Sequence, residues 1–271
     1  MCKPLNTGGI LPNLMQKLFD STLLDKPENI VCATLLTGRY DVNRNEQLSE
    51  DNFDLVRGWY NSVVRLKMRG IIFHNTFSGK TSKRYENEYI TFIAVDFDKK
   101  LNANVFRYLL YQEFIQTYSS FIKAIFVTDI ADVEVVINPF DQSFFLNNPT
   151  ALFCGDEPKP LVNEWMNDHS THLRNAIPEF SSYEQANGSK TLLNCGVIGG
   201  TIRVMQPLID SLAAMHRQYT TQNTTPYTLD MGTFNYIART RFGDQLLHGA
   251  PINTVFKGYE TTRSDCWFRH K

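Results

Sequence analysis

The sequence predicts an α/β domain with a mostly parallel sheet, because short apolar runs alternate along it with segments of helical periodicity. Residues 29–36 (NIVCATLL) form the first such run and suit a buried strand. Residues 124–127 (AIFV) form another, which follows a helical pattern directly and is continuously apolar, as central parallel strands are. With 271 residues the chain is long enough for one large domain, and we expect a single one.

Local patterns predict the other elements. Residues 50–69 are expected to form one helix, with Ser49 as its N-cap and Gly70 as its stop. Residues 103–123 form a second helix, because their apolar positions recur at helical spacing and one stripe then faces the core. The polar stretch 78–87 has no such pattern and is expected to be a loop. Further strands are expected at 71–74, 89–95, 133–137, 152–154 and 192–198, and further helices at 202–219 and 229–241.

Composition excludes several classes of protein. The formal net charge is −1, so no general basic surface indicates a nucleic-acid or anionic-lipid partner. The five cysteines are odd in number and include no CxxC pair, which argues against a zinc knuckle or a disulfide framework and favours a reducing compartment. No run reaches the roughly 18 apolar residues of a membrane span, and no signal peptide is evident. We therefore expect a cytoplasmic protein without a transmembrane segment; its end at Lys271, without a polar tail, is compatible with a domain cut from a longer polypeptide.

Two acids follow the apolar run 124–127 at the predicted carboxyl end of its strand. Ligands of open α/β sheets bind beyond these strand ends, which is where Asp129 and Asp132 fall. Two carboxylates suit Mg²⁺ or Mn²⁺, which share their coordination with substrate phosphates. The spacing alone does not identify a metal site, since an isolated D-x-x-D more often belongs to an exposed loop or a helix cap.

Four motifs in a fixed order resemble the GT-A glycosyltransferases. Residues 107–111 (RYLLY), 126–136 (FVTDIADVEVV) and 138–140 (NPF) resemble the helix and D-x-D-like core of that family. Residues 193–200 (LNCGVIGG) resemble the N-x-G-hydrophobic strand of the glycogenin and lipooligosaccharide galactosyltransferase group, residues 229–235 (LDMGTFN) its D-Q-x-x-x-N segment, and residues 268–271 (FRHK) its terminal metal-binding strand. The resemblance spans roughly residues 105–271. It departs from the family in the spacing of Asp129 and Asp132, which are separated by one residue more than usual, and in Met231, which replaces a common glutamine.

The resemblance implies a GT-A (Rossmann-like) fold, a mostly parallel sheet flanked by helices. One domain would then divide into a nucleotide-binding half, about 1–140, and an acceptor and metal half, about 141–271. The implied activity is metal-dependent transfer of a sugar from a nucleoside diphosphate donor, favoured as UDP-linked, to a hydroxyl of a glycan or glycolipid acceptor, with retention favoured. The implied metal ligands are Asp129, Asp132 and His270, and a histidine ligand favours Mn²⁺ over Mg²⁺.

The resemblance also implies roles around this metal. Contacts to the nucleotide or its phosphates are expected from Ala33, Thr34, Tyr40, Arg107, Asp129 and Lys271, the last together with Arg269. Catalytic or sugar-contacting roles are expected from Asp230, Asp156 and Asn194, although an acid in the first turn of a helix, as Asp230 is, also stabilises the helix dipole. A solvated helix arginine is an equal alternative for Arg107. Among the tryptophans, Trp59 is expected to pack inside, whereas Trp165 and Trp267 are expected to contact sugar.

Other enzyme classes fit less well. A haloacid dehalogenase-type phosphatase needs its second acid two positions after the first, whereas Asp132 is three positions after Asp129. The sequence has neither G-x-x-x-x-G-K-[ST] nor G-x-G-x-x-G, which disfavours P-loop kinases and nicotinamide enzymes. Two alternatives stay open: a sugar nucleotidyltransferase, although its basic Gly-rich loop is missing, and a carbohydrate-binding GT-A-like domain without turnover.

Overall fold

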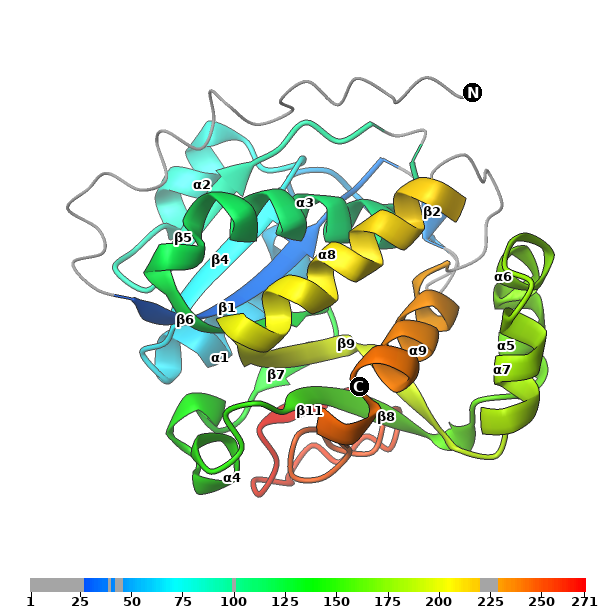
Figure 1. The fold of residues 1–271 in the computed structure, drawn as a ribbon. Coiled ribbons are helices and arrows are strands. Elements are labelled where there is room, and N and C mark those ends of the chain that lie inside the picture. Colours follow the sequence, from blue (N-terminus) through cyan, green and yellow to red (C-terminus); the bar gives the residue numbers. More distant parts are fainter. Residues whose placement is uncertain (1–26, 39, 42–45, 99–100, 220–228) are drawn as a thin grey trace.

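A seven-stranded sheet of order β10-β8-β9-β6-β1-β4-β5 forms the centre of the computed structural model, which describes residues 27–38, 40–41, 46–98, 101–219 and 229–271 (Figure 1). Its neighbouring strands are parallel except where β9 pairs with β6 and with β8. The predicted mostly parallel α/β sheet is therefore confirmed. The strands are β1 (Glu28–Leu35), β4 (Arg69–His74), β5 (Ile90–Ala94), β6 (Ile122–Thr128), β8 (Leu152–Pro160), β9 (Thr191–Thr201) and β10 (Leu246–His248).

Two short sheets accompany the central one. The strands β7 (Val133–Val135) and β11 (Phe268–His270) pair antiparallel, as do β2 (Tyr40–Asp41) and β3 (Glu46–Gln47). The pairing of β7 with β11 brings the carboxyl-terminal strand back to the residues that follow β6.

Helices cover both faces of the central sheet. Figure 1 shows α3 and α8 side by side across one face. The α-helices are α1 (Arg57–Arg65), α2 (Gly79–Tyr85), α3 (Ala103–Tyr118), α4 (Ser143–Leu146), α5 (Glu164–His169), α6 (Thr171–Ala176), α7 (Phe180–Asn187), α8 (Ile202–Tyr219) and α9 (Asp230–Arg241). Single 3₁₀ turns are η2 (Phe53–Leu55), η3 (Ser119–Phe121), η4 (Pro139–Asp141) and η5 (Gly243–Gln245). No helix in the described part of the chain is long and apolar enough to cross a membrane.

The central strand β1 separates two apolar cores. Its successive side chains point to opposite faces, as the period of two in a strand requires. Ile30 and Cys32 join the core that includes α3 and α8. Val31 and Ala33 join the core on the other face, which includes α1 and β11. Because both faces are covered, β1 is apolar at nearly every position, and this continuous run is what made it predictable.

The prediction of one helix over 50–69 is wrong at both ends. The chain forms the 3₁₀ turn η2 and then α1, and the cap of η2 is Asn52, whose side chain accepts from Asp54 N at 3.0 Å. Gly70 does not stop a helix, because it lies inside β4 and pairs with Val31. A Cβ on Gly70 would lie 2.5 Å from Ile90 Cδ1, so this glycine serves the close packing of β4.

Other boundaries also differ from the expected ones. The loop expected over 78–87 is instead the helix α2, capped by Ser78, whose Oγ accepts from Thr81 N at 3.2 Å. None of the α2 side chains is buried, so no apolar stripe marks it. The helix expected over 103–123 gives way to β6 at Ile122, and the strand expected at 152–154 continues to Pro160. Three short helices, α5, α6 and α7, were not predicted.

The buried histidines make the fold sensitive to acid. His216 is fully buried and stacks on Tyr108 with ring centroids 5.2 Å apart, and burial lowers its pKa to about 3. His74 is also buried, with Nδ1 accepting from Phe77 N at 3.2 Å, and burial lowers its pKa to about 4. In the unfolded chain both pKa values are about 6.5. Below that pH the unfolded state therefore binds more protons than the folded state, and acid favours unfolding.

The free energy of unfolding is accordingly expected to fall between pH 7 and pH 5, by up to about 2 kcal/mol for each of these two histidines. Urea titrations at the two pH values measure the change. The variant His216→Phe removes one titrating group and keeps an aromatic ring against Tyr108. Its pH dependence should be weaker than that of the native protein, and equal dependence would contradict this assignment.

Candidate active site

Three side chains that are distant in the sequence meet at the carboxyl end of β6. Asp129 follows β6 directly, Asp132 precedes β7, and His270 is the last residue of β11. Each offers one ligand atom, and these atoms all lie within 4.8 Å of one another. The β-ladder accounts for this placement, since His270 pairs with Val133 and Lys271 N donates to Asp132 O at 3.0 Å. The structure thus brings together the three side chains that the motifs single out.

The donor set and its surroundings fit a hard or borderline divalent cation. Two carboxylates and one imidazole are ligands that Mn²⁺ and Mg²⁺ accept, with Mn²⁺ favoured by the imidazole. Burial lowers the pKa of His270, which keeps the imidazole neutral and able to coordinate. Gly196 allows the two ligand side chains to pack against the backbone of β9: a Cβ there would lie 2.2 Å from His270 Cε1 and 2.9 Å from Asp129 Oδ2. Any other residue at this position would displace one of the two ligands.

Arg107 links the three-residue cluster to the helix α9. Its guanidinium donates from Nη1 to Asp129 Oδ1 and from Nη2 to Asp230 Oδ2, the latter at 2.5 Å. Arg107 and Asp230 are both buried, so Arg107 is not a solvated helix arginine. Burial raises the pKa of the Asp230 carboxyl, and the positive charge of Arg107 opposes this change. Among the described residues, Arg107 Nε and Asp230 Oδ1 have no hydrogen-bond partner, so two buried polar atoms remain for a ligand.

Asn194 sits beside Gly196 and is held by hydrogen bonds on both sides of its amide. Its Oδ1 accepts from Gly196 N at 2.5 Å, and its Nδ2 donates to Glu157 Oε1 at 2.8 Å. Gly196 O in turn accepts from Asp129 N at 2.9 Å. Asn194 therefore fixes the backbone of Gly196, which in turn binds Asp129 N, and this is a positioning role.

Glu157 is a site residue that sequence reasoning missed. It is 7% exposed, and its Oε1 accepts from Asn194 Nδ2 at 2.8 Å, which joins it to the strand segment beside Asp129. A glutamate is ordinarily exposed, so nothing in its local sequence marked it as buried. The sequence instead predicted a catalytic or sugar-contacting role for its neighbour Asp156.

Asp156 is paired with a histidine outside the three-residue cluster. It lies inside β8, and its Oδ2 is 2.9 Å from His248 Nδ1 at the end of β10. Gly249 follows with a φ of +75°, and a Cβ there would lie 2.8 Å from Asp156 Oδ2. Because β6, β8 and β10 run in the same direction, this pair lies at the same edge of the sheet as Asp129.

The other residues expected to contact the nucleotide do not belong to the metal cluster. Ala33 is buried and Thr34 half-buried in the last residues of β1, and both belong to the sheet ladder with β4. Tyr40 begins β2, and its side chain lies outside the described residues. Lys271 Nζ lies 2.5 Å from Glu134 Oε1, and Arg269 Nη1 lies 3.0 Å from Glu134 Oε2. One carboxylate thus holds both cations of the carboxyl terminus.

The three tryptophans differ in how deeply they are buried. Trp267 is 2% exposed and packs edge-on against Phe126, so its expected sugar contact is wrong. Trp165 is half-buried and stacks on His169 with ring centroids 3.7 Å apart. Trp59 packs inside as expected, and its Nε1 donates to Thr128 Oγ1 at 2.8 Å.

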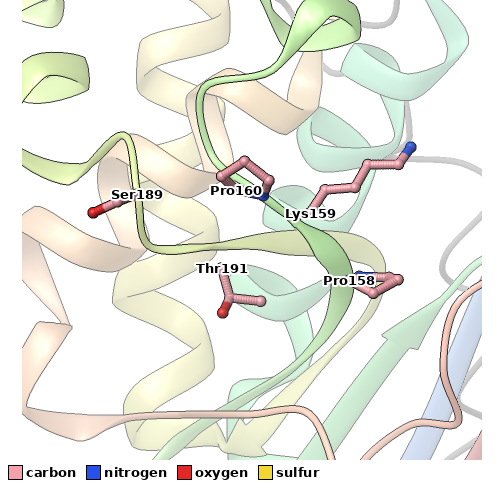
Figure 2. A pocket seen from close by; sticks show the side chains of 5 residues that line it. All are labelled: Pro158, Lys159, Pro160, Ser189 and Thr191. Atoms are coloured by element: carbon pink, nitrogen blue, oxygen red, sulfur yellow. The ribbon is translucent and has the colours of Figure 1, made fainter.

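A shallow pocket lies apart from all these candidates. Figure 2 shows it between the last part of β8 and the start of β9. None of its lining residues belongs to the predicted site. They are Pro158, Lys159, Pro160, Ser189 and Thr191.

Comparison with known proteins shows a likeness to solved structures. No protein-family model matches the chain, and no curated protein matches it. A solved structure described as a glycosyltransferase involved in the glycosylation of the major capsid of PBCV-1 is similar over 90% of this chain and 92% of that chain. The TM-score is 0.46 and the sequence identity is 11%.

Proposed function

We propose that the protein is a metal-dependent glycosyltransferase that moves a sugar from a nucleoside diphosphate donor, with UDP as the nucleotide, to a hydroxyl of a glycan acceptor. The observation that carries this proposal is the convergence of Asp129, Asp132 and His270 at the carboxyl end of β6. The order of the GT-A-like motifs supports the same function. Retention of the anomeric configuration follows the resemblance to the glycogenin-like group.

The side chains of the cluster have separate tasks in this reaction. Asp129, Asp132 and His270 would hold Mn²⁺ or Mg²⁺, which supplies Lewis-acid stabilisation of the departing nucleoside diphosphate. Arg107 fixes one Asp129 oxygen and leaves the other toward His270, 3.9 Å from its Nε2. The missing side chain of Gly196 lets His270 and Asp129 lie close to the backbone of β9, and so close to each other.

The donor sugar is assigned to the neighbourhood of Asp230, because Arg107 joins this carboxylate to Asp129 of the metal cluster. Asp230 Oδ1 has no hydrogen-bond partner within the described chain. Asp230 is therefore proposed as the residue that orients the donor sugar, and Asp156 as a contact to the acceptor.

The assay that tests this function measures release of nucleoside diphosphate from a panel of nucleotide sugars, with Mn²⁺ and with EDTA. Release from at least one donor, dependent on Mn²⁺, is the expected result. No metal-dependent release from any donor, with binding retained, would instead identify a carbohydrate-binding domain without turnover. Formation of a nucleoside triphosphate from donor and pyrophosphate would identify a sugar nucleotidyltransferase.

A further inference from the structure

A short turn between β10 and β11 is closed by its own hydrogen bonds. We name it the 255–260 turn. Val255 N donates to Glu260 Oε2 at 2.9 Å, and Gly258 N donates to Val255 O at 2.9 Å. Arg263 holds the same carboxylate, with Nη1 3.1 Å from Glu260 Oε2. The two ends of the turn are therefore fixed together, and the residues between them form a compact surface feature.

The 255–260 turn lies against a proposed metal ligand. The ring of Phe256 packs on the imidazole of His270, with ring centroids 4.5 Å apart. Lys257 Nζ lies 5.3 Å from the centroid of the Phe256 ring. Thr254, which precedes the turn, accepts through Oγ1 from His270 N at 3.1 Å. The turn is thus joined to a proposed metal ligand by Phe256 within it and by Thr254 just before it.

The turn holds an exposed aromatic residue in a costly backbone conformation. Lys257 has φ +57° and Tyr259 has φ +49°, both in the left-handed region. This region is unfavourable for residues that carry a Cβ, because the Cβ lies too close to the following carbonyl oxygen. Tyr259 is 71% exposed, more than any other large hydrophobic side chain among the described residues, so burial does not offset that cost. Backbone strain of this kind is concentrated at functional sites.

We infer that Tyr259 is a stacking platform for a pyranose ring of the acceptor glycan. This inference rests on the proposed function and adds the place of the second substrate. A tyrosine ring offers an apolar face and a polar hydroxyl at its edge. A pyranose has the matching pattern, since its ring C–H groups form an apolar face and its hydroxyls lie around the edge. Val255, 43% exposed in the same turn, extends the apolar surface.

The sheet order favours the acceptor over the nucleobase as the occupant. The end of β1, where the base is expected, is separated from β10 by β6, β9 and β8. The 255–260 turn follows β10, on the side of the sheet where Asp156, inside β8, pairs with His248 at the end of β10. The platform and the Asp156 pair therefore belong to the acceptor side of the metal cluster.

Saturation-transfer NMR with the methyl α- and β-glycosides of glucose, galactose and mannose, recorded with UDP and Mn²⁺ present, tests the inference. The native protein is expected to bind at least one glycoside. Tyr259→Asn should weaken that binding about tenfold, the scale of one aromatic stacking contact. Asparagine tolerates the left-handed region, so the turn should keep its shape. Tyr259→Phe should retain most of the binding.

The matched control is Phe121→Asn, which removes another exposed ring, 40% exposed, just before the opposite end of β6. It should leave glycoside binding unchanged. Calorimetry with UDP and Mn²⁺ separates the two substrates: Tyr259→Asn should bind UDP as the native protein does. Weaker UDP binding, unchanged glycoside binding, or no glycoside binding by the native protein would each overturn the platform. Absence of Mn²⁺-dependent UDP binding by the native protein would instead overturn the proposed function.

Discussion

Replacing Asp132 by alanine is expected to abolish Mn²⁺-dependent binding of UDP while leaving the fold intact. Only three side chains among the described residues form the cluster, so the variant loses a third of the protein's ligand atoms. Loss of a group that merely supports a metal ligand costs 10- to 100-fold in affinity or activity, so loss of a ligand should cost about 100-fold or more. The backbone should remain, because Lys271 N binds the carbonyl oxygen of Asp132 and not its side chain.

Calorimetry of UDP binding with and without Mn²⁺ measures the effect, and circular dichroism checks the fold. The control is Asp168→Ala, which removes an exposed carboxylate from α5 and changes the net charge equally. It should bind UDP with native affinity. Equal UDP affinity in the Asp132 variant and the native protein would remove the metal cluster as the basis of the proposed function.

The parts of the fold that could be predicted are those in which burial leaves a regular pattern. β1 and β6 are covered on both faces and are continuously apolar, whereas α8 has one apolar stripe, and its expected bounds 202–219 match the structure. The helix α2 has no buried side chain and therefore no such stripe. Gly70 was misjudged because a glycine that ends a helix and one that allows close packing in a strand look the same in sequence.

Only those site residues that belong to the ordered motifs could be predicted from the sequence. That order identified Asp129, Asp132 and His270, which the structure brings together. It did not identify Glu157, since burial of a carboxylate depends on partners such as Asn194 that are distant in the sequence. Nor did it reveal that Glu134 holds Lys271, because that contact depends on the pairing of β7 with β11.

Replacing Arg107 by methionine is expected to destabilise the protein strongly. The guanidinium lies between Asp129 and Asp230, and the Asp230 side chain is 1% exposed. Methionine fills a similar volume but leaves a buried carboxylate without its cation, which typically costs about 3–5 kcal/mol. Urea unfolding at pH 7 measures the loss. Arg57→Met is the matched control, because Arg57 pairs with Asp54 at the surface and exposed ion pairs contribute little.

The pH dependence distinguishes an unpaired buried charge from a simple packing defect. Without Arg107, burial and the negative charge of Asp129 raise the pKa of the Asp230 carboxyl further. Above about pH 4, Asp230 in the folded variant keeps a proton that the unfolded chain has released. Lower pH therefore stabilises the folded variant, and its loss of stability relative to the native protein should be smaller at pH 5 than at pH 7. The double variant Arg107→Met with Asp230→Asn carries no such charge, and it should recover stability at pH 7 and lose this extra pH dependence. The Arg107→Met variant could instead lose the same amount of stability at pH 7 and at pH 5. That result would mean that Arg107 and Asp230 stabilise the protein through their packing and that other groups already compensate the charge of Asp230.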